Sequence, residues 1–270
     1  MEETVIQPAT RDAILSYLEG FLDNFLNNFI QRFQTTQLKP RRRSAGDAKP
    51  FHIAILGPKV RPILSFERSF STSLGTTFEE SARLIALSRF AEAEREYTVK
   101  GSAPAAALTT IDSIDRRIRE SGRTDSYPSL VAAVANTYRA DLSPRELKVD
   151  LYVKDHAGNE CFFEIKTPEP NRSQCLTVTR EHLTIHAIKG AGPPKIRTYY
   201  GMAYNPYGPR KDQYRWSFAR QLLDLENQVL IGDEFWDFLG GKGTYEELLA
   251  IYEEAGIVMG QNVVERLTNL

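Results

Sequence analysis

The chain has 270 residues, of which 41% are hydrophobic and 26% are charged, and its formal net charge is −1 at pH 7. This composition is that of an ordinary globular protein and excludes a low-complexity or repeat protein. The length allows one sizeable domain, or one domain with a helical extension. The two cysteines, Cys161 and Cys175, favour a reduced, cytoplasmic compartment over a disulfide framework.

Neither a secretory signal nor a membrane span is expected. The residues that follow Met1 are Glu2 and Glu3, which are acidic where a signal peptide would be basic. The apolar run at residues 21–29 is interrupted by Asp23 and by three asparagines, so it does not suit the interior of a bilayer. We therefore expect no membrane partner.

Charge is unevenly distributed along the chain. Residues 1–36 carry a net charge of −3 and residues 216–270 carry −7, whereas residues 37–72 carry +6 and residues 148–215 carry +4. A basic surface on an otherwise acidic body is typical of a protein that binds the phosphates of a nucleic acid. Chance clustering in a sequence of mixed charge is the alternative.

The first predicted element is an amphipathic helix over residues 10–33, since apolar side chains recur there at spacings of three and four. They are Ile14, Tyr17, Leu18, Phe21, Leu22, Phe25, Phe29 and Phe33. Such a stripe belongs to a core or a dimer contact, so residues 1–36 are interpreted as a helical segment with a possible dimer contact. Residues 37–50 form a basic linker that includes the Lys-Pro-Arg-Arg-Arg run at 39–43. This linker is either a solvated loop or an arm that grips phosphate.

The main domain is predicted to span residues 51–270 and to begin with a short apolar strand at residues 51–56. A further strand is expected at residues 195–203, where β-formers alternate with other residues. The last segment is strongly acidic, so its helices are expected to face away from nucleic acid. Helices are predicted at residues 111–122, 127–142, 214–225, 233–239 and 245–255.

Another helix is predicted at residues 76–97, with Ser73 or Thr76 able to cap it. Glu79 and Glu80 then lie in its first turn. Acidic side chains at that position interact favourably with the helix dipole, which explains them without any role in chemistry. The alternative is that one of them belongs to an active site.

The most informative segment is a predicted hairpin at residues 148–166. Its first strand alternates and is rich in β-formers, and residues 155–159 have the composition of a turn. Thirteen residues separate Asp150 from Glu164, and Glu164 and Lys166 share a face of the second strand because they are two positions apart. These charges interrupt an apolar run, and burying charge without a partner is costly, so a metal or phosphate is a natural reason for them. The alternative is a surface hairpin with a solvated row of ion pairs.

Two carboxylates and a lysine on one sheet face suit a Mg²⁺-dependent phosphodiesterase. Mg²⁺ binds through one or two carboxylates, here Asp150 and Glu164, and the carbonyl of Ile165 can add a third oxygen. The ion, for which Mn²⁺ is expected to substitute, polarises the scissile phosphate and lowers the pKa of a water. Lys166 holds that water or helps to deprotonate it, and stabilises charge developing on the phosphate.

Three motifs resemble those of known nucleases. The Asp150 and Glu164-Ile165-Lys166 pattern resembles the PD-(D/E)XK nuclease superfamily, although Val149 stands where the name-giving proline would be. Residues 73–83 are similar to the G-x-x-F-E helix that precedes the catalytic hairpin in many type II restriction endonucleases, with Glu79 at the matching glutamate. The loop at residues 199–208 resembles one found in TdeIII-type restriction enzymes.

The resemblance implies an α/β fold with a restriction-endonuclease-like core, in which a mixed central sheet is flanked by helices and extended by helices at both termini. It also implies a homodimer that cleaves double-stranded DNA at a short palindrome with Mg²⁺, and it suggests GGNCC as the site. A cognate DNA methyltransferase is expected as a genetic neighbour, because a site-specific deoxyribonuclease must spare its own genome. The catalytic residues are then Asp150, Glu164, Lys166 and Glu79.

Basic residues interleaved with aromatic and amide side chains follow the strand at residues 195–203. Arginine pairs bidentately with guanine, and asparagine or tyrosine can contact bases or phosphates. An ordinary exposed loop would also be polar. The residues predicted to contact DNA are Arg68, Thr167, Asn171, Arg172, Lys195, Asn205, Tyr207, Arg210, Lys211 and Arg215.

Two other motifs are weaker. His182 and His186 are four apart and would share a helix face, but Glu181 precedes the first histidine, so the pattern is not that of a zinc protease and no third ligand is evident. Residues 240–244 contain Gly-Lys-Gly-Thr without the spacing of a P-loop, and a turn after a helix explains them better.

Three functions remain open from the sequence. The first is a site-specific restriction endonuclease. The second is a structure-specific repair nuclease that uses the same metal site. The third is a non-catalytic DNA-binding module in which the hairpin is structural.

Overall fold

The computed structural model describes residues 4–38, 55 and 61–268. The chain divides into a sheet unit, Met1–Thr10 with Phe78–Glu247, and a helical unit, Arg11–Thr77 with Leu248–Leu270. This division differs from the boundaries predicted after residues 36 and 50, because the C-terminal helix shares a unit with the N-terminal one. The predicted strand at 51–56, apart from Ile55, and the basic run at 39–43 lie outside the described residues.

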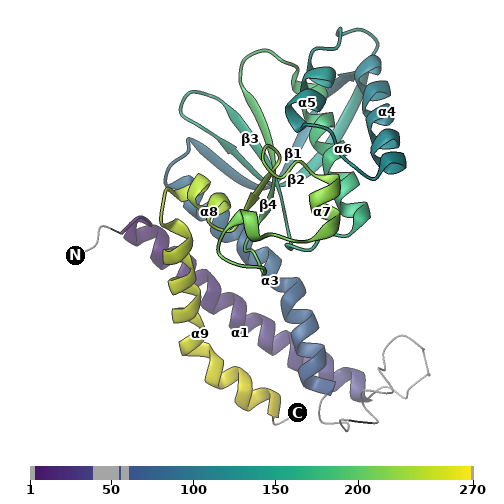
Figure 1. The fold of residues 1–270 in the computed structure, drawn as a ribbon. Helices are drawn as coiled ribbons and strands as arrows, with labels where there is room; N and C mark the ends of the chain where they lie inside the picture. Colours follow the sequence, from purple (N-terminus) through teal and green to yellow (C-terminus); the bar gives the residue numbers. More distant parts are fainter. Residues whose placement is uncertain (1–3, 39–54, 56–60, 269–270) are drawn as a thin grey trace. The chain divides into compact units, whose positions relative to one another are not determined.

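The helical unit consists of parts of three helices, α1 (Pro8–Leu38), α3 (Arg61–Leu87) and α9 (Thr244–Thr268) (Figure 1). The predicted N-terminal helix is confirmed, and its apolar stripe packs mainly within the chain. The ring of Phe25 lies 5.6 Å from that of Phe70, and Phe29 lies 5.4 Å from Phe66. Much of the stripe predicted as a possible dimer contact is therefore covered by α3.

The sheet unit contains five strands in the order β1-β2-β3-β4-β5 (Figure 1). β1 pairs with β2 and β2 with β3 in antiparallel fashion, whereas β3 pairs with β4 and β4 with β5 in parallel. The strands are β1 (Glu92–Pro104), β2 (Leu142–Lys154), β3 (Glu160–Lys166), β4 (Ile196–Met202) and β5 (Val229–Ile231). The predicted hairpin, the strand after residue 195 and the mixed sheet are confirmed.

Helices cover both faces of this sheet. Figure 1 shows α4 (Ala105–Ser121), α5 (Tyr127–Ala135) and α6 (Arg172–Lys189) grouped on one side, and the short α7 (Ser217–Leu222) packs against α6 there. On this side the main core includes Phe162. The next residue, Phe163, points to the opposite face and packs on α8 (Asp233–Gly240), because side chains alternate along a strand.

The predicted helix at residues 76–97 is wrong at both ends. Helix α3 begins at Arg61 and ends at Leu87, so Ser73 and Thr76 lie inside it and do not cap it. After a turn at residues 88–91, the rest of the predicted helix belongs to β1, which contains the β-formers after residue 96. The helix predicted at 127–142 likewise ends at residue 135, and β2 begins at 142. β5 was not predicted, since three residues carry too little periodicity.

The helices predicted after residue 210 are present with altered bounds. A 3₁₀ turn (η2, Lys211–Gln213) precedes α7, which is shorter than predicted, and α9 is longer. The glycines after α8 form the turn expected from the sequence, with Gly241 as C-cap at a φ of 101°. Within the described residues, no helix is long and apolar enough to cross a membrane.

Candidate active site

The two strands of the predicted hairpin separate at Asp150. Their last matched pair is Leu151 with Phe163, and beyond it the Asp150 carboxylate accepts a hydrogen bond from the backbone N–H of Ile165 at 2.7 Å. The carboxylate thus takes the place of a strand partner for that N–H. On the other side, Glu96 of β1 has a φ of 52°, a conformation uncommon for a residue with a side chain. Asp150 therefore occupies a fork in the sheet.

The fork brings together the three residues singled out by the sequence. The Lys166 ammonium lies 2.9 Å from an oxygen of Asp150 and 2.9 Å from an oxygen of Glu164. The contact with Glu164 confirms that these side chains share a face of β3. Side-chain exposures of 20% for Asp150, 17% for Glu164 and 36% for Lys166 leave the cluster accessible from solvent. We call these three residues the fork cluster.

The fork cluster is electrostatically strained at its acidic end. Burial, together with the negative charge of Asp150, raises the pKa of Glu164 to about 7. Burial alone would lower the pKa of Lys166, but Asp150 and Glu164 outweigh it and raise that pKa above its ordinary value. Lys166 is thus held protonated, while Glu164 gains from any further positive charge placed beside it.

Glu79 lies at the edge of this cluster and is held by Arg95 of β1, at 2.9 Å. Burial raises the pKa of Glu79 and Asp150 adds to the rise, although Arg95 opposes it. Glu80 is turned toward Arg83 and Arg95, whose hydrogen bonds outweigh burial and lower its pKa. The charge of Asp150 therefore acts on Glu79, whereas Glu80 is paired with two arginines. The helix-dipole alternative is wrong for both, since they lie well inside α3.

Two residues near the fork cluster were missed from the sequence. Arg95 was assigned to a helix; the neighbouring Tyr-Thr-Val run was the signal for a strand. Glu181 of α6 was noted only as part of a histidine pattern. Burial raises the pKa of Glu181, Lys166 lowers it and Asp150 raises it, so this acid interacts electrostatically with the same cluster.

The histidines of that pattern are structural. Both His182 and His186 are buried in the core, and neither ring nitrogen of His182 has a hydrogen-bond partner among the described residues. His186 contacts the hydroxyl of Thr198 at 3.2 Å. Within the described chain, no group of three or more His, Cys, Asp or Glu side chains is arranged to hold a metal. A cation at the fork therefore depends on two carboxylates with backbone, water or phosphate oxygens.

The residues predicted to contact DNA are not all gathered at the fork. Thr167 directly follows β3 and is exposed. Lys195 precedes β4, whose start pairs with the start of β3, so it lies at the opposite end of the sheet from Lys166. Arg68 belongs to the helical unit.

Two more of these residues are occupied by local contacts. Asn171 caps α6 in a reciprocal capping box with Gln174. Arg172 donates to the carbonyl of Arg119 at 2.7 Å. Their contact with DNA stays a prediction, and it would require these bonds to be shared or broken.

The loop after β4 is internally braced. The Asn205 side chain donates to the carbonyl of Arg210 and accepts from the backbone of Tyr207, whose hydroxyl donates to Glu169 at 2.6 Å. Arg210 pairs with Asp212. Lys211 donates to the Val229 carbonyl and pairs with Glu234. Arg215 alone of these cations is exposed without a charged partner among the described residues.

Comparison with known proteins identifies the chain. The family model of HinfI, a type II restriction endonuclease, matches residues 6–256. The chain belongs to the HinfI family of type II restriction endonucleases. It is 37% identical to the type II restriction enzyme HgiBI of Herpetosiphon aurantiacus over 97% of this chain and 98% of that protein. It is 38% identical to the type II restriction enzyme HgiCII of the same organism over 97% of this chain and 99% of that protein.

Membership of the HinfI family makes the chain a nuclease that acts on double-stranded DNA. Type II restriction endonucleases generally use divalent metal ions, and the fork cluster offers oxygen ligands suited to one. The type II restriction endonuclease expected from the sequence is thereby confirmed at the level of the family.

Proposed function

We propose that this HinfI-family chain hydrolyses phosphodiester bonds of double-stranded DNA at a short palindromic site, with Mg²⁺, through a PD-(D/E)XK core. The observation that carries the proposal is the fork cluster, where Asp150, Glu164 and Lys166 meet at the diverging ends of a hairpin. A purely structural ion-pair row would not require a carboxyl group whose pKa is raised to about 7.

The donor set fits Mg²⁺. Asp150 and Glu164 supply two carboxylates, and the carbonyl of Ile165 supplies a third oxygen, which leaves positions for water and phosphate oxygens. A dication at this position would offset the burial and the charge of Asp150 that together raise the pKa of Glu164. Bound there, Mg²⁺ would polarise the scissile phosphate and lower the pKa of a water.

Lys166 acts as a charged donor. Its raised pKa keeps the ammonium protonated at neutral pH, so it orients the attacking water and stabilises negative charge on the phosphate. Asp150 fixes this geometry, because the same oxygen accepts from the Ile165 N–H and from the lysine. Glu79 supports the cluster from α3 while Arg95 holds its carboxylate in place.

Finer features rest on the sequence resemblance. They are a homodimer acting on a palindrome, GGNCC as the site, a methyltransferase gene nearby and the relation to TdeIII-type enzymes. A two-fold symmetric site favours a two-fold symmetric enzyme. A structure-specific repair nuclease with the same metal site is the second candidate, and it would nick branched DNA without producing discrete fragments.

Digestion of a phage genome with the purified chain in Mg²⁺, followed by sequencing of the ends, tests the proposal. Discrete fragments with one shared sequence at their ends are expected, and a smear would contradict site-specific cleavage. Mn²⁺ should raise the thermal stability of the wild-type chain, and Asp150→Asn should abolish both this rise and cleavage. Asp112→Asn is the matched control, since Asp112 pairs with Arg180 away from the fork. Full cleavage by Asp150→Asn would exclude the fork as the metal site.

A further inference from the structure

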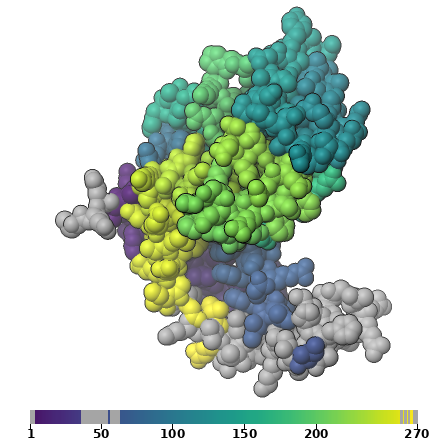
Figure 2. All heavy atoms as spheres, in the orientation of Figure 1, coloured from purple at the N-terminus to yellow at the C-terminus, as the bar shows by residue number. Residues whose placement is uncertain are grey.

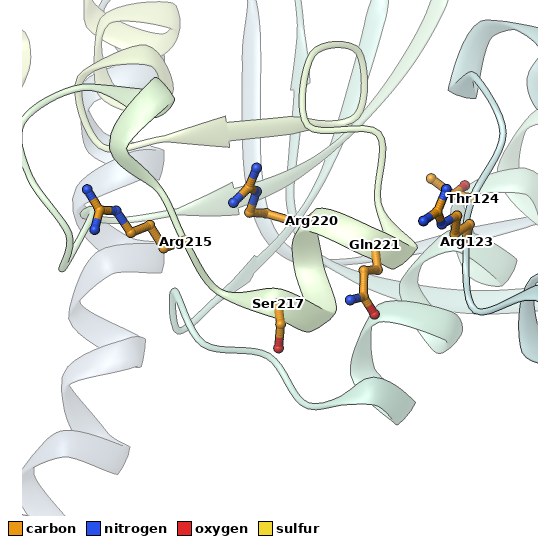
Figure 3. A pocket seen from close by; sticks show the side chains of 6 residues that line it. All are labelled: Arg123, Thr124, Arg215, Ser217, Arg220 and Gln221. Carbon is orange, nitrogen blue, oxygen red and sulfur yellow. The ribbon is translucent and has the colours of Figure 1, made fainter.

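A pocket of about 480 Å³ opens beside α7, at the loop between α4 and α5 (Figure 3). Every side chain that lines it can donate a hydrogen bond, and none of the lining residues is acidic. In Figure 3, Arg220 lies between Arg215 and Arg123 along the wall formed by α7. The lining residues are Arg123, Thr124, Arg215, Ser217, Arg220 and Gln221. Such a lining attracts anions and repels cations.

The three arginines of this pocket differ from neighbouring arginines in having no carboxylate partner among the described residues. On α4, Arg117 pairs with Asp125, and Arg119 pairs with Asp115 at 2.7 Å. In the described part of the chain, the structure gives no such carboxylate partner to the guanidinium groups of the pocket. All three side chains belong to exposed residues, so their positive charge is available to a ligand from solvent.

Hydrogen bonds hold both walls of the pocket in place. The Tyr214 hydroxyl donates to the carbonyl of Pro168, and the Trp216 indole donates to that of Pro170 at 2.7 Å. These prolines follow Lys166 by two and four positions, so Arg215 is anchored to the segment that leaves the catalytic strand. The other wall is held by the Thr124 N–H, which donates to the Gln221 carbonyl at 2.9 Å.

The pocket is reachable by a large ligand. On the face seen in Figure 2, the segment after β4 (green) and the α4–α5 region (teal) both form part of the outer surface. A row of cations along this surface suits a polymer with regularly spaced charges. Planar guanidinium groups match phosphate oxygens bidentately, and hydroxyl and amide donors commonly join such contacts to the DNA backbone.

We infer that this pocket binds backbone phosphates of double-stranded DNA away from the scissile bond; the inference rests on the proposed function. Arg123, Arg215 and Arg220 supply the charge, and Ser217 and Thr124 supply additional donors. The pocket gives Arg215 a phosphate contact in place of the base contact predicted from the sequence. It positions the duplex through contacts that carry no base information, so their loss should weaken binding to any sequence.

Salt dependence of DNA binding tests this inference. Fluorescence anisotropy of a random duplex of about 30 base pairs, in EDTA and at several salt concentrations, measures the slope of log affinity against log salt. The double variant Arg123→Gln/Arg220→Gln should bind more weakly and lose about 2 from the magnitude of that slope, roughly 0.9 for each lost phosphate contact. The variant Arg123→Lys/Arg220→Lys should keep most of the slope because it keeps the charge.

Arg180→Gln is the control, since it removes one positive charge from an arginine that pairs with Asp112 outside the pocket, and it should leave the slope unchanged. An unchanged thermal midpoint shows that each variant is folded. A wild-type slope in the folded double glutamine variant would overturn the inference. The rise in thermal midpoint on adding inorganic phosphate distinguishes free phosphate from DNA phosphate as the ligand. If the double glutamine variant lost this rise but kept the wild-type salt slope for DNA, the pocket would bind free phosphate and the inference would fail.

The proposed function can fail separately. If the wild-type chain cut phage DNA at discrete sites while the double variant kept its slope, only the pocket assignment would be wrong. If the slope fell as expected but no site-specific cleavage occurred, the phosphate contact would stand and the proposed function would not.

Discussion

The fork cluster and the histidine pair of α6 are both candidate metal sites in sequence, and their burial separates them. Asp150, Glu164 and Lys166 are charged, in mutual contact and partly exposed. His182 and His186 are sealed in the core, and burial lowers their pKa values to about 3 and about 4. The histidines are therefore neutral at pH 7, with no carboxylate partner among the described contacts.

The difference shows that spacing alone does not make a site. Residues four apart on a helix share a face, but that face can be the one that packs into the core. At the fork, an acid with a raised pKa lies in a cluster that solvent can reach, which is typical of functional groups. The two histidines avoid the cost of burying a charge because both rings are neutral at pH 7. The two clusters should thus respond differently to substitution and in opposite directions to pH.

Among the predictions that compare the two clusters, removal of the lysine should have the largest effect. Lys166→Ala is expected to lower the cleavage rate by about 10³-fold or more, because it deletes the charged donor to water and phosphate. Lys154→Ala is the matched control on the same hairpin, since that lysine pairs with Glu92 at the surface. Initial rates on supercoiled plasmid in Mg²⁺ measure both. A loss smaller than tenfold for Lys166→Ala would make the fork cluster structural, like the histidine pair.

The two glutamates of α3 should differ. Glu79→Gln is expected to reduce cleavage by about 10–100-fold, as loss of an outer partner of a metal site commonly does. Glu80→Gln should reduce it by a smaller factor, since that carboxylate is bonded to Arg83 and Arg95. The cleavage rates of the two variants, each normalised to the amount of folded protein, measure this difference. Equal losses would mean that Arg95, their shared partner, matters more than either acid.

The metal-free protein should show the strain of the fork in its pH dependence. The pKa of Glu164 is raised from 4.5 to about 7, so its contribution to stability is present below pH 4.5 and is lost as pH rises through about 7. Glu164→Gln should therefore raise the thermal midpoint in EDTA at pH 8 relative to wild type by more than at pH 5. Mn²⁺ should stabilise the wild type but not the variant. Equal midpoint differences at the two pH values would contradict a raised pKa.

The histidine pair should show the opposite sign and a smaller effect. Its pKa values are lowered from 6.5, so its stability contribution is present above about pH 6.5 and is lost as pH falls toward 4. His182→Leu should change stability at pH 7 by only about 1 kcal/mol, since it replaces an unbonded polar ring with an apolar side chain. It should also reduce the loss of stability on acidification and leave cleavage intact. If a folded His182→Leu variant lost cleavage, the histidine pair would have a role in the active site.

Much of the local structure was predictable from the sequence. Alternation and turn composition predicted the hairpin, and apolar spacing predicted the N-terminal helix, because both signals are local. The error at residues 76–97 arose where a helix and a strand follow each other within a few residues. Propensity there is ambiguous, and pairing with β2 decides that β1 is a strand.

The sequence by itself determined which residues form the fork cluster, since Asp150, Glu164 and Lys166 stand on one short hairpin whose geometry follows from its strands. Only the tertiary structure decided that Arg95 holds Glu79, that Glu181 interacts electrostatically with the cluster, and that Arg123 lines one pocket with Arg215 and Arg220. These interactions join different elements of the chain. Their proximity depends on how the helices pack on the sheet, which no local pattern specifies.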